Sequence, residues 1–314
     1  MIKQDSYPSD QDIDIKELTL LFWRKKTLIF FVSSFFFLAS VIISLYLPVL
    51  YQSSATLKII PTSSQSSSTS NNVSDKLGGA ASVFLGGGSA STDYVLAEKT
   101  IYSRDFFKHL ISFDGILAKL KYFDNYDKAS GELIFSDEVY DANQSKWLKK
   151  YDASNEEDLS YLDAYRTYKS IISISWKKSE SEFMTISVVH PSPNFAKEFL
   201  SLIIQETNAL VRERKFYETE ESLKYLNSQL AQTTVAEIRS SINSIIMNQL
   251  NAQMIASVRK NYLLSPLDAP FVPDERFSPR RTLIVVLSSI LGFCLTLICV
   301  VIYHYNFETN RFKK

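Results

Sequence analysis

The chain has 314 residues, with 34 basic and 34 acidic side chains and a formal net charge of zero. This balance excludes the strongly basic class of proteins that bind nucleic acid through its phosphates, so we expect no nucleic-acid partner. Both cysteines, Cys294 and Cys299, lie in one apolar segment near the C-terminus. The rest of the chain therefore holds neither a disulfide framework nor a cysteine metal site.

Two long apolar segments, 27–47 and 282–305, contain no charged residue. At about 1.5 Å per helical residue, each is long enough to cross the ~30 Å hydrocarbon core of a bilayer. A cleaved signal peptide is the alternative for the first segment, but its apolar region usually has only about 7 to 15 residues. We therefore predict two transmembrane helices, surrounded by membrane lipids.

Basic residues near these segments predict the topology. Six lie on the outer flanks of the two segments, and Arg280 and Arg281 lie on the inner flank of the second. The six are Arg24, Lys25, Lys26, Arg311, Lys313 and Lys314. Because cytoplasmic flanks are enriched in Lys and Arg, we expect both termini in the cytoplasm and residues 48–281 on the opposite side.

The leader, residues 1–26, ends in "DIDIKELTLLFWRKK". Apolar residues recur there at helical spacing after Asp12 or Asp14 as a possible N-cap, and Trp23 stands at the membrane boundary. This pattern predicts a helix at the membrane interface.

The segment "YQSSATLKI", 51–59, alternates with period two, which predicts a strand with Tyr51, Ala55 and Ile59 on one face. Residues 61–92 then form a loop rich in Ser, Thr, Gly and Asn, too polar to hold a core. Its glycines match neither phosphate-binding motif, because the chain has no Gly-Lys pair and Ser91 stands where a dinucleotide fingerprint needs glycine.

The same loop carries a short apolar insert between two glycine clusters, formed by Val83, Phe84 and Leu85. We consider two interpretations: a plug that docks on another surface, or a plain disordered linker.

Residues 93–111 are predicted to form one amphipathic helix, with Val95, Ile101 and Leu110 among its apolar positions. Residues 113–168 are ambiguous, and we expect short helices and loops. Two alternating runs, 170–176 and 183–189, predict a β-hairpin.

From Asn194 to Ser265 the chain has no Gly and no Pro, and apolar residues recur at helical intervals. We predict a long helical hairpin over 194–262 that breaks near residue 233, where Thr234 and Glu237 fit a capping box. One bent helix is the alternative. The recurring apolar residues include Ile238, Leu250 and Met254. One apolar stripe would pack the two arms of the hairpin, and a second would pack neighbouring copies.

A stiff connector, 263–281, precedes the second apolar segment and carries Pro266, Pro270, Pro273 and Pro279. It has room for one edge strand. Within the second segment, Ser288 and Gly292 are four residues apart, a spacing of small residues that allows close helix approach; the alternative is that both face lipid.

No pattern in the sequence indicates catalysis. His109, His190 and His304 are scattered, none lies at metal-binding spacing, and no Gly-x-Ser-x-Gly elbow is present. A pair of carboxylates that meets only in the fold stays open. We expect no enzymatic activity, no cofactor and no metal.

Several segments in order along the chain resemble the polysaccharide co-polymerases, the Wzz-type chain-length determinants of O-antigen and related glycans. Besides the leader and the 51–59 strand, they are "SRDFFKHL" (103–110), "MTISVVHPSPNFAKEFL" (184–200), "SLKYLNSQLAQTTVAEIRSSI" (222–242) and "LDAPFVPDERFSPRRTLIVVL" (267–287). The resemblance implies an inner-membrane protein whose periplasmic part assembles into a homo-oligomeric ring. It also implies a non-enzymatic role: with a membrane polymerase, the ring sets how far lipid-linked repeat units are extended.

Some members of this family carry a cytoplasmic tyrosine kinase after the second transmembrane segment. In this chain nine residues, 306–314, follow that segment. We therefore expect the kinase-free type. A component of a capsule or exopolysaccharide export complex is the alternative function. A transmembrane receptor is a third possible class. It would need a cytoplasmic signalling domain, and the segments 1–26 and 306–314 are too short to form one.

Together these features predict an α+β membrane protein, with two transmembrane helices flanking a periplasmic α/β base and a long projecting helical hairpin. The base would comprise 48–193 and 263–281.

Overall fold

The computed structural model describes residues 22–61, 90–127, 131, 133–135, 140–141, 146–147, 159–176 and 182–311. These residues form two compact units. One unit, Leu50–Arg276, contains the mixed helix and sheet fold, and the other joins the segments before Leu50 and after Arg276.

A four-stranded antiparallel sheet, in the order β6-β7-β1-β8, organises the larger unit. Its strands are β1 (Tyr51–Ile59), β6 (Ile172–Trp176), β7 (Phe183–His190) and β8 (Leu264–Asp268). Every second residue of β1, from Tyr51 to Ile59, is buried, as the alternation predicts. The β6–β7 hairpin and the edge strand in the connector are also confirmed.

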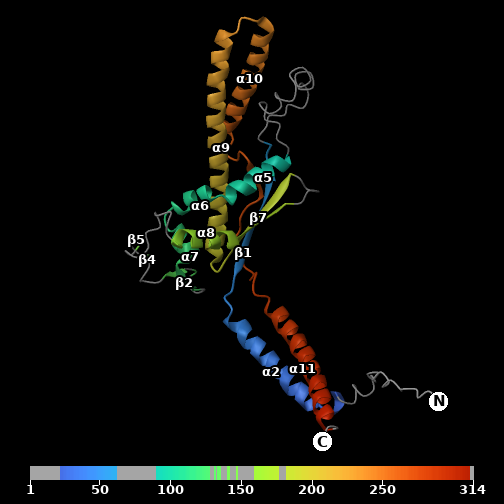
Figure 1. Ribbon diagram of the computed structural model, residues 1–314. Coiled ribbons are helices and arrows are strands. Elements are labelled where there is room, and N and C mark those ends of the chain that lie inside the picture. The colour runs from blue at the N-terminus through green and yellow to red at the C-terminus, as the bar shows by residue number, and fades with distance from the viewer. Residues whose placement is uncertain are drawn as a thin grey trace, which may run out of the picture. The chain divides into compact units, whose positions relative to one another are not determined.

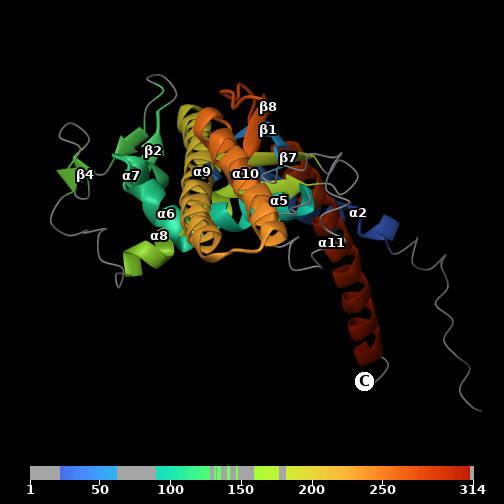
Figure 2. The same ribbon diagram turned by 90° about the horizontal axis from the view of Figure 1, so that it is seen from above.

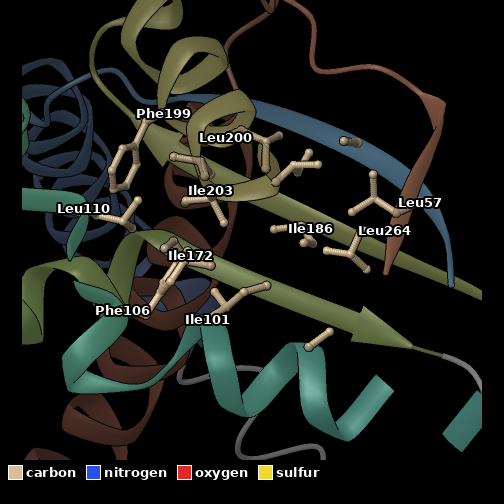
Figure 3. Close-up of a cluster of buried hydrophobic side chains, with 14 of the residues drawn as sticks. Leu57, Ile101, Phe106, Leu110, Ile172, Ile186, Phe199, Leu200, Ile203 and Leu264 are labelled. Carbon is tan, nitrogen blue, oxygen red and sulfur yellow. The ribbon is translucent and has the colours of Figure 1, made fainter. Parts of the chain in front are cut away.

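Helices cover the buried face of this sheet. The first turns of α9 (Pro193–Gln232) pack on β1 and β7, and α5 (Ala90–Ile101) packs against α9 and β1. Figure 3 shows Leu200 and Ile203 of α9 close to Ile186 and Leu57 of the sheet. Each side chain in this cluster is fully buried, and burying one aliphatic side chain contributes about 1.5–3 kcal/mol.

The expected helix over 93–111 is wrong in one respect: the structure has two helices, α5 and α6 (Arg104–Ile111). Ser103 separates them, because its extended backbone ends the run and its side chain accepts a hydrogen bond from the N–H of Phe106, at 3.1 Å. The break turns α6 so that Phe106, Phe107 and Leu110 are all buried. Val95, expected on the apolar face, is 47% exposed.

The region between α6 and β6 contains the expected short helices and, in addition, short strands that were not expected. It contains α7 (Ile116–Lys121) and α8 (Leu159–Ile171). Two small antiparallel pairs join β2 (Phe123–Tyr126) with β3 (Leu133–Phe135), and β4 (Tyr140–Asp141) with β5 (Lys146–Trp147). The fully buried Tyr168 of α8 donates a hydrogen bond to the carbonyl of Ile101, at 2.7 Å, and so fixes α8 to the end of α5.

The predicted helical hairpin is confirmed. α9 has 40 residues and α10 (Ala236–Val258) has 23, so they extend for about 60 and 35 Å. Figures 1 and 2 show the two helices side by side, with α9 continuing down to the sheet. The buried residues of α9 fall between Phe195 and Val211, apart from Thr219, so its lower part belongs to the base and its upper part to the hairpin.

The expected capping box at the turn is wrong. The residue at the N-cap of α10 is Val235, with no side-chain cap hydrogen bond, so Thr234 lies one residue too early to pair with Glu237. Instead, Thr233 ends α9: its hydroxyl and its N–H both bond to the carbonyl of Gln229, at 2.8 and 3.1 Å.

In the smaller unit, α2 (Lys26–Tyr46) packs against α11 (Arg281–Arg311). Residues Lys26–Tyr46 and Arg281–Tyr303 have mean hydropathies of 2.5 and 2.8 and are mostly exposed to the surroundings. Each is long and apolar enough to cross a membrane.

Candidate functional surfaces

The four prolines of the connector do not form one cluster. Pro266 lies on β8 and is exposed, Pro270 is half-buried and Pro273 is buried, all in the larger unit. Pro279 belongs to the smaller unit, where it follows a cis peptide bond. The connector is held to the sheet beyond β8, since the hydroxyl of Ser53 donates to the carbonyl of Phe271, at 2.8 Å.

A buried amide, Asn208 of α9, fixes the start of the connector. Its Oδ1 accepts hydrogen bonds from the N–H groups of Leu263 and Leu264, and its Nδ2 donates to the carbonyl of Leu264, all at 2.8 Å. Nδ2 also donates to the carbonyl of Ile204 of α9, at 3.1 Å. Asn208 is 3% exposed, so these bonds form away from water, where an unmade partner is costly.

The sequence interpretation missed Asn208, although one signal was present. Asn208 stands on the same helical line as Leu200, Ile204 and Val211, all of which are buried. A polar residue on the apolar face of a helix predicts a specific hydrogen-bond partner.

The outer face of α10 is unusual for an exposed helix. Between Arg239 and Arg259 the sequence has no charged residue. Large apolar side chains are nevertheless exposed there: Met247 at 59%, Leu250 at 38%, Met254 at 64% and Val258 at 83%. Ile238, which precedes this uncharged stretch, is also exposed, at 49%.

A groove of about 200 Å³ lies between α9 and the connector. Its lining includes Ser201 and Gln205 of α9, then Lys260 and Asn261, then Pro266 and Pro270. Gln205, Lys260 and Asn261 are exposed, and none of the three has a hydrogen-bond or ion-pair partner within the described part of the chain. The buried Asn208 forms part of the groove wall.

The two apolar helices meet closely at Gly292. A Cβ atom added at Gly292 would lie 2.6 Å from the Cβ of Phe36 in α2, closer than real atoms approach. Thr296, one turn further along α11, is buried, and its hydroxyl bonds to the Gly292 carbonyl at 2.6 Å. Ser288, the other predicted packing residue, is half-buried. The partner of Gly292 is thus a large residue, Phe36, which the spacing of small residues alone does not indicate.

The apolar insert of Val83, Phe84 and Leu85 lies outside the described residues, as does most of the leader, so both interpretations of the insert stay open.

Two histidines, His109 and His190, pack within the larger unit. His109 of α6 pairs with Glu206 of α9, with 2.7 Å between His109 Nε2 and the carboxylate. His190 is 1% exposed, and its Nδ1 accepts from the N–H of Ser192, at 3.1 Å. Burial lowers the pKa of His190 to about 4, so its ring is neutral at pH 7. Within the described ranges, no group of three or more His, Cys, Asp or Glu could hold a metal ion.

Comparison with known proteins agrees with the family resemblance. Residues 11–112, about a third of the chain, match the family model described as Wzz, chain length determinant protein. No curated protein matches the chain. A solved structure titled "full-length bacterial polysaccharide co-polymerase" is 13% identical, with a TM-score of 0.37, and the similarity covers 95% of this chain and 99% of that one. Over residues 11–112 the chain is thus similar to the Wzz chain length determinants.

Proposed function

We propose that this chain is a non-enzymatic regulator of polysaccharide length in the bacterial inner membrane. It acts as a ring of identical copies beside a membrane polymerase that extends lipid-linked repeat units of an O-antigen type of glycan. The match of residues 11–112 to the chain length determinant family carries this proposal. The two candidate spans and the long helical hairpin support it.

The topology belongs to the same proposal. Both termini lie in the cytoplasm, because the outer flanks of the two spans carry most of the nearby Lys and Arg residues. The unit Leu50–Arg276 then lies in the periplasm, where the glycan is extended.

The exposed face of α10 supports assembly into a ring. Interfaces between subunits are poor in charge at their centre and enriched in Met, whereas solvated helix faces usually carry charges. The face with Met247, Leu250, Met254 and Val258 has that composition. Covering it with a neighbouring copy removes exposed apolar surface from water.

The connector supports a mechanical role for the fold. Asn208 and Ser53 hold the start of the connector to α9 and β1, and the same connector continues into α11. A change in the position of the hairpin would therefore move the start of the connector with it, without any group that needs to react chemically.

Gene deletion tests the proposed function. The surface glycan of the deletion strain, separated on a gel, should change from a clustered to a broad distribution of lengths, and the restored gene should return the cluster. An unchanged distribution would contradict the proposal. Complete loss of surface glycan would favour a component of an export complex instead.

A further inference from the structure

The groove between α9 and the connector is lined by exposed polar side chains that have no hydrogen-bond partner within the described residues. Its lining amides, Gln205 and Asn261, each offer both a donor and an acceptor, and Lys260 adds a donor. Ser201, another polar lining residue, is half-buried and donates to the carbonyl of Lys197, at 2.9 Å. No acidic side chain is among the residues that line it.

Two proline rings give the same groove an apolar side. Pro266 of β8 and Pro270, just beyond that strand, both line it. A sugar ring has the matching character, with hydroxyl groups around its edge that both donate and accept, and C–H groups on its faces that pack on apolar surfaces.

The size of the groove restricts the ligand. Sites that enclose a drug-sized molecule usually have about 300–1,000 Å³, whereas this groove has about 200 Å³. It therefore accommodates one ring-sized unit. Because the groove is open to the surface, further units of a polymer can extend beyond it.

Its walls are held in place before any ligand binds. Asn208 ties α9 to Leu263 and Leu264 through three hydrogen bonds, so the spacing between helix and connector is fixed by buried contacts. A site whose walls are already fixed loses less conformational freedom on binding.

We propose that the groove formed by Ser201, Gln205, Lys260, Asn261, Pro266 and Pro270 is a subsite that binds one sugar unit of the growing glycan. This inference rests on the proposed function, and it names the glycan itself as a direct ligand of each copy. Gln205 and Asn261 bind the hydroxyl groups of the sugar, and the proline rings pack against its face.

The test uses the full-length chain purified in detergent. The probe is the oligosaccharide released by mild acid from the glycan whose length changes when the gene is deleted. We expect saturation-transfer NMR to detect its binding to the wild-type chain. The double variant Gln205→Ala, Asn261→Ala should bind it about tenfold more weakly, because at least two hydrogen bonds are lost.

Two further variants make the test specific. Ser201→Trp should abolish binding by filling the groove. Asn227→Ala removes an exposed amide of the same helix, about 33 Å from Gln205 along its axis, and should bind like the wild type. The double variant Gln205→Ala, Asn261→Ala should keep the thermal midpoint of the wild type, since the two amides that it removes are exposed.

The outcomes separate this inference from the proposed function. If deletion changes the glycan length but the groove variants bind the oligosaccharide as tightly as the wild type, the proposed subsite is wrong and the proposed function is not contradicted. The same conclusion follows if the wild type does not bind the oligosaccharide. Should deletion leave every glycan unchanged, both are wrong. Weaker binding by the groove variants together with normal binding by Asn227→Ala supports the subsite.

Discussion

Replacing Asn208 with Leu should destabilise the larger unit strongly and loosen the start of the connector. The two side chains have the same number and branching of heavy atoms, and Leu is the larger, so the substitution leaves no cavity. It removes the partners of three backbone groups, the N–H groups of Leu263 and Leu264 and the carbonyl of Leu264. Each unsatisfied buried group costs about 1–3 kcal/mol, and partial access to water at the edge strand gives a total of about 3–6 kcal/mol.

That loss is large compared with the about 5–15 kcal/mol by which domains are usually stable. The free energy of unfolding would be measured by denaturant titration of the full-length chain in detergent. Hydrogen exchange of the peptide covering residues 259–268 would show whether the connector opens locally. Asn227→Leu, an exposed amide of the same helix, is the matched control and should change little. A loss below about 1 kcal/mol with unchanged exchange in Asn208→Leu would refute the assigned role of Asn208.

Three further predictions follow from the packing and burial of single residues. Gly292→Leu should weaken the pairing of α2 with α11 by about 1–3 kcal/mol, because Phe36 occupies the space that the new side chain needs. Adding Phe36→Ala should restore the thermal midpoint. If the double variant is not restored, the contact between Gly292 and Phe36 is wrong. Met254→Lys should reduce the mass of the homo-oligomer measured by light scattering, because it places a charge on the uncharged face of α10. The control Asn227→Lys should leave the mass unchanged. An unchanged mass for Met254→Lys would exclude this face as an interface. His190 should destabilise the fold in acid, because its pKa of about 4 lies below the ~6.5 of an unfolded histidine. Its contribution is complete above pH 6.5 and decreases by about 3 kcal/mol as the pH falls to 4. The difference in unfolding free energy between wild type and His190→Gln should therefore shrink over this range, and a constant difference would contradict the burial argument.

Patterns along the sequence predicted the regular elements well. The alternation in 51–59 predicted both β1 and its buried face, because a strand with one covered face requires period two. The absence of Gly and Pro over 194–265 predicted the long helices, and their break near residue 233 was also predicted, although the capping box used for it does not form.

Features decided by tertiary contacts were harder to predict. The split between α5 and α6 depends on the cap at Ser103, which a continuous apolar pattern conceals. The cap of α10 is at Val235 although Thr234 has the better side chain, because the end of α9 at Thr233 fixes the path of the turn. Asn208 and the groove bring residues more than fifty positions apart together, and no local spacing encodes those pairs.

Reconstitution tests the central claim most directly. The purified membrane polymerase and its lipid-linked repeat units would be placed in liposomes with and without this chain, and the product lengths measured on a gel. The account predicts a narrow distribution with the chain and a broad one without it, at a similar total amount of polymerised sugar. The same distribution in both cases, or polymerisation that requires the chain, would contradict a regulator of glycan length.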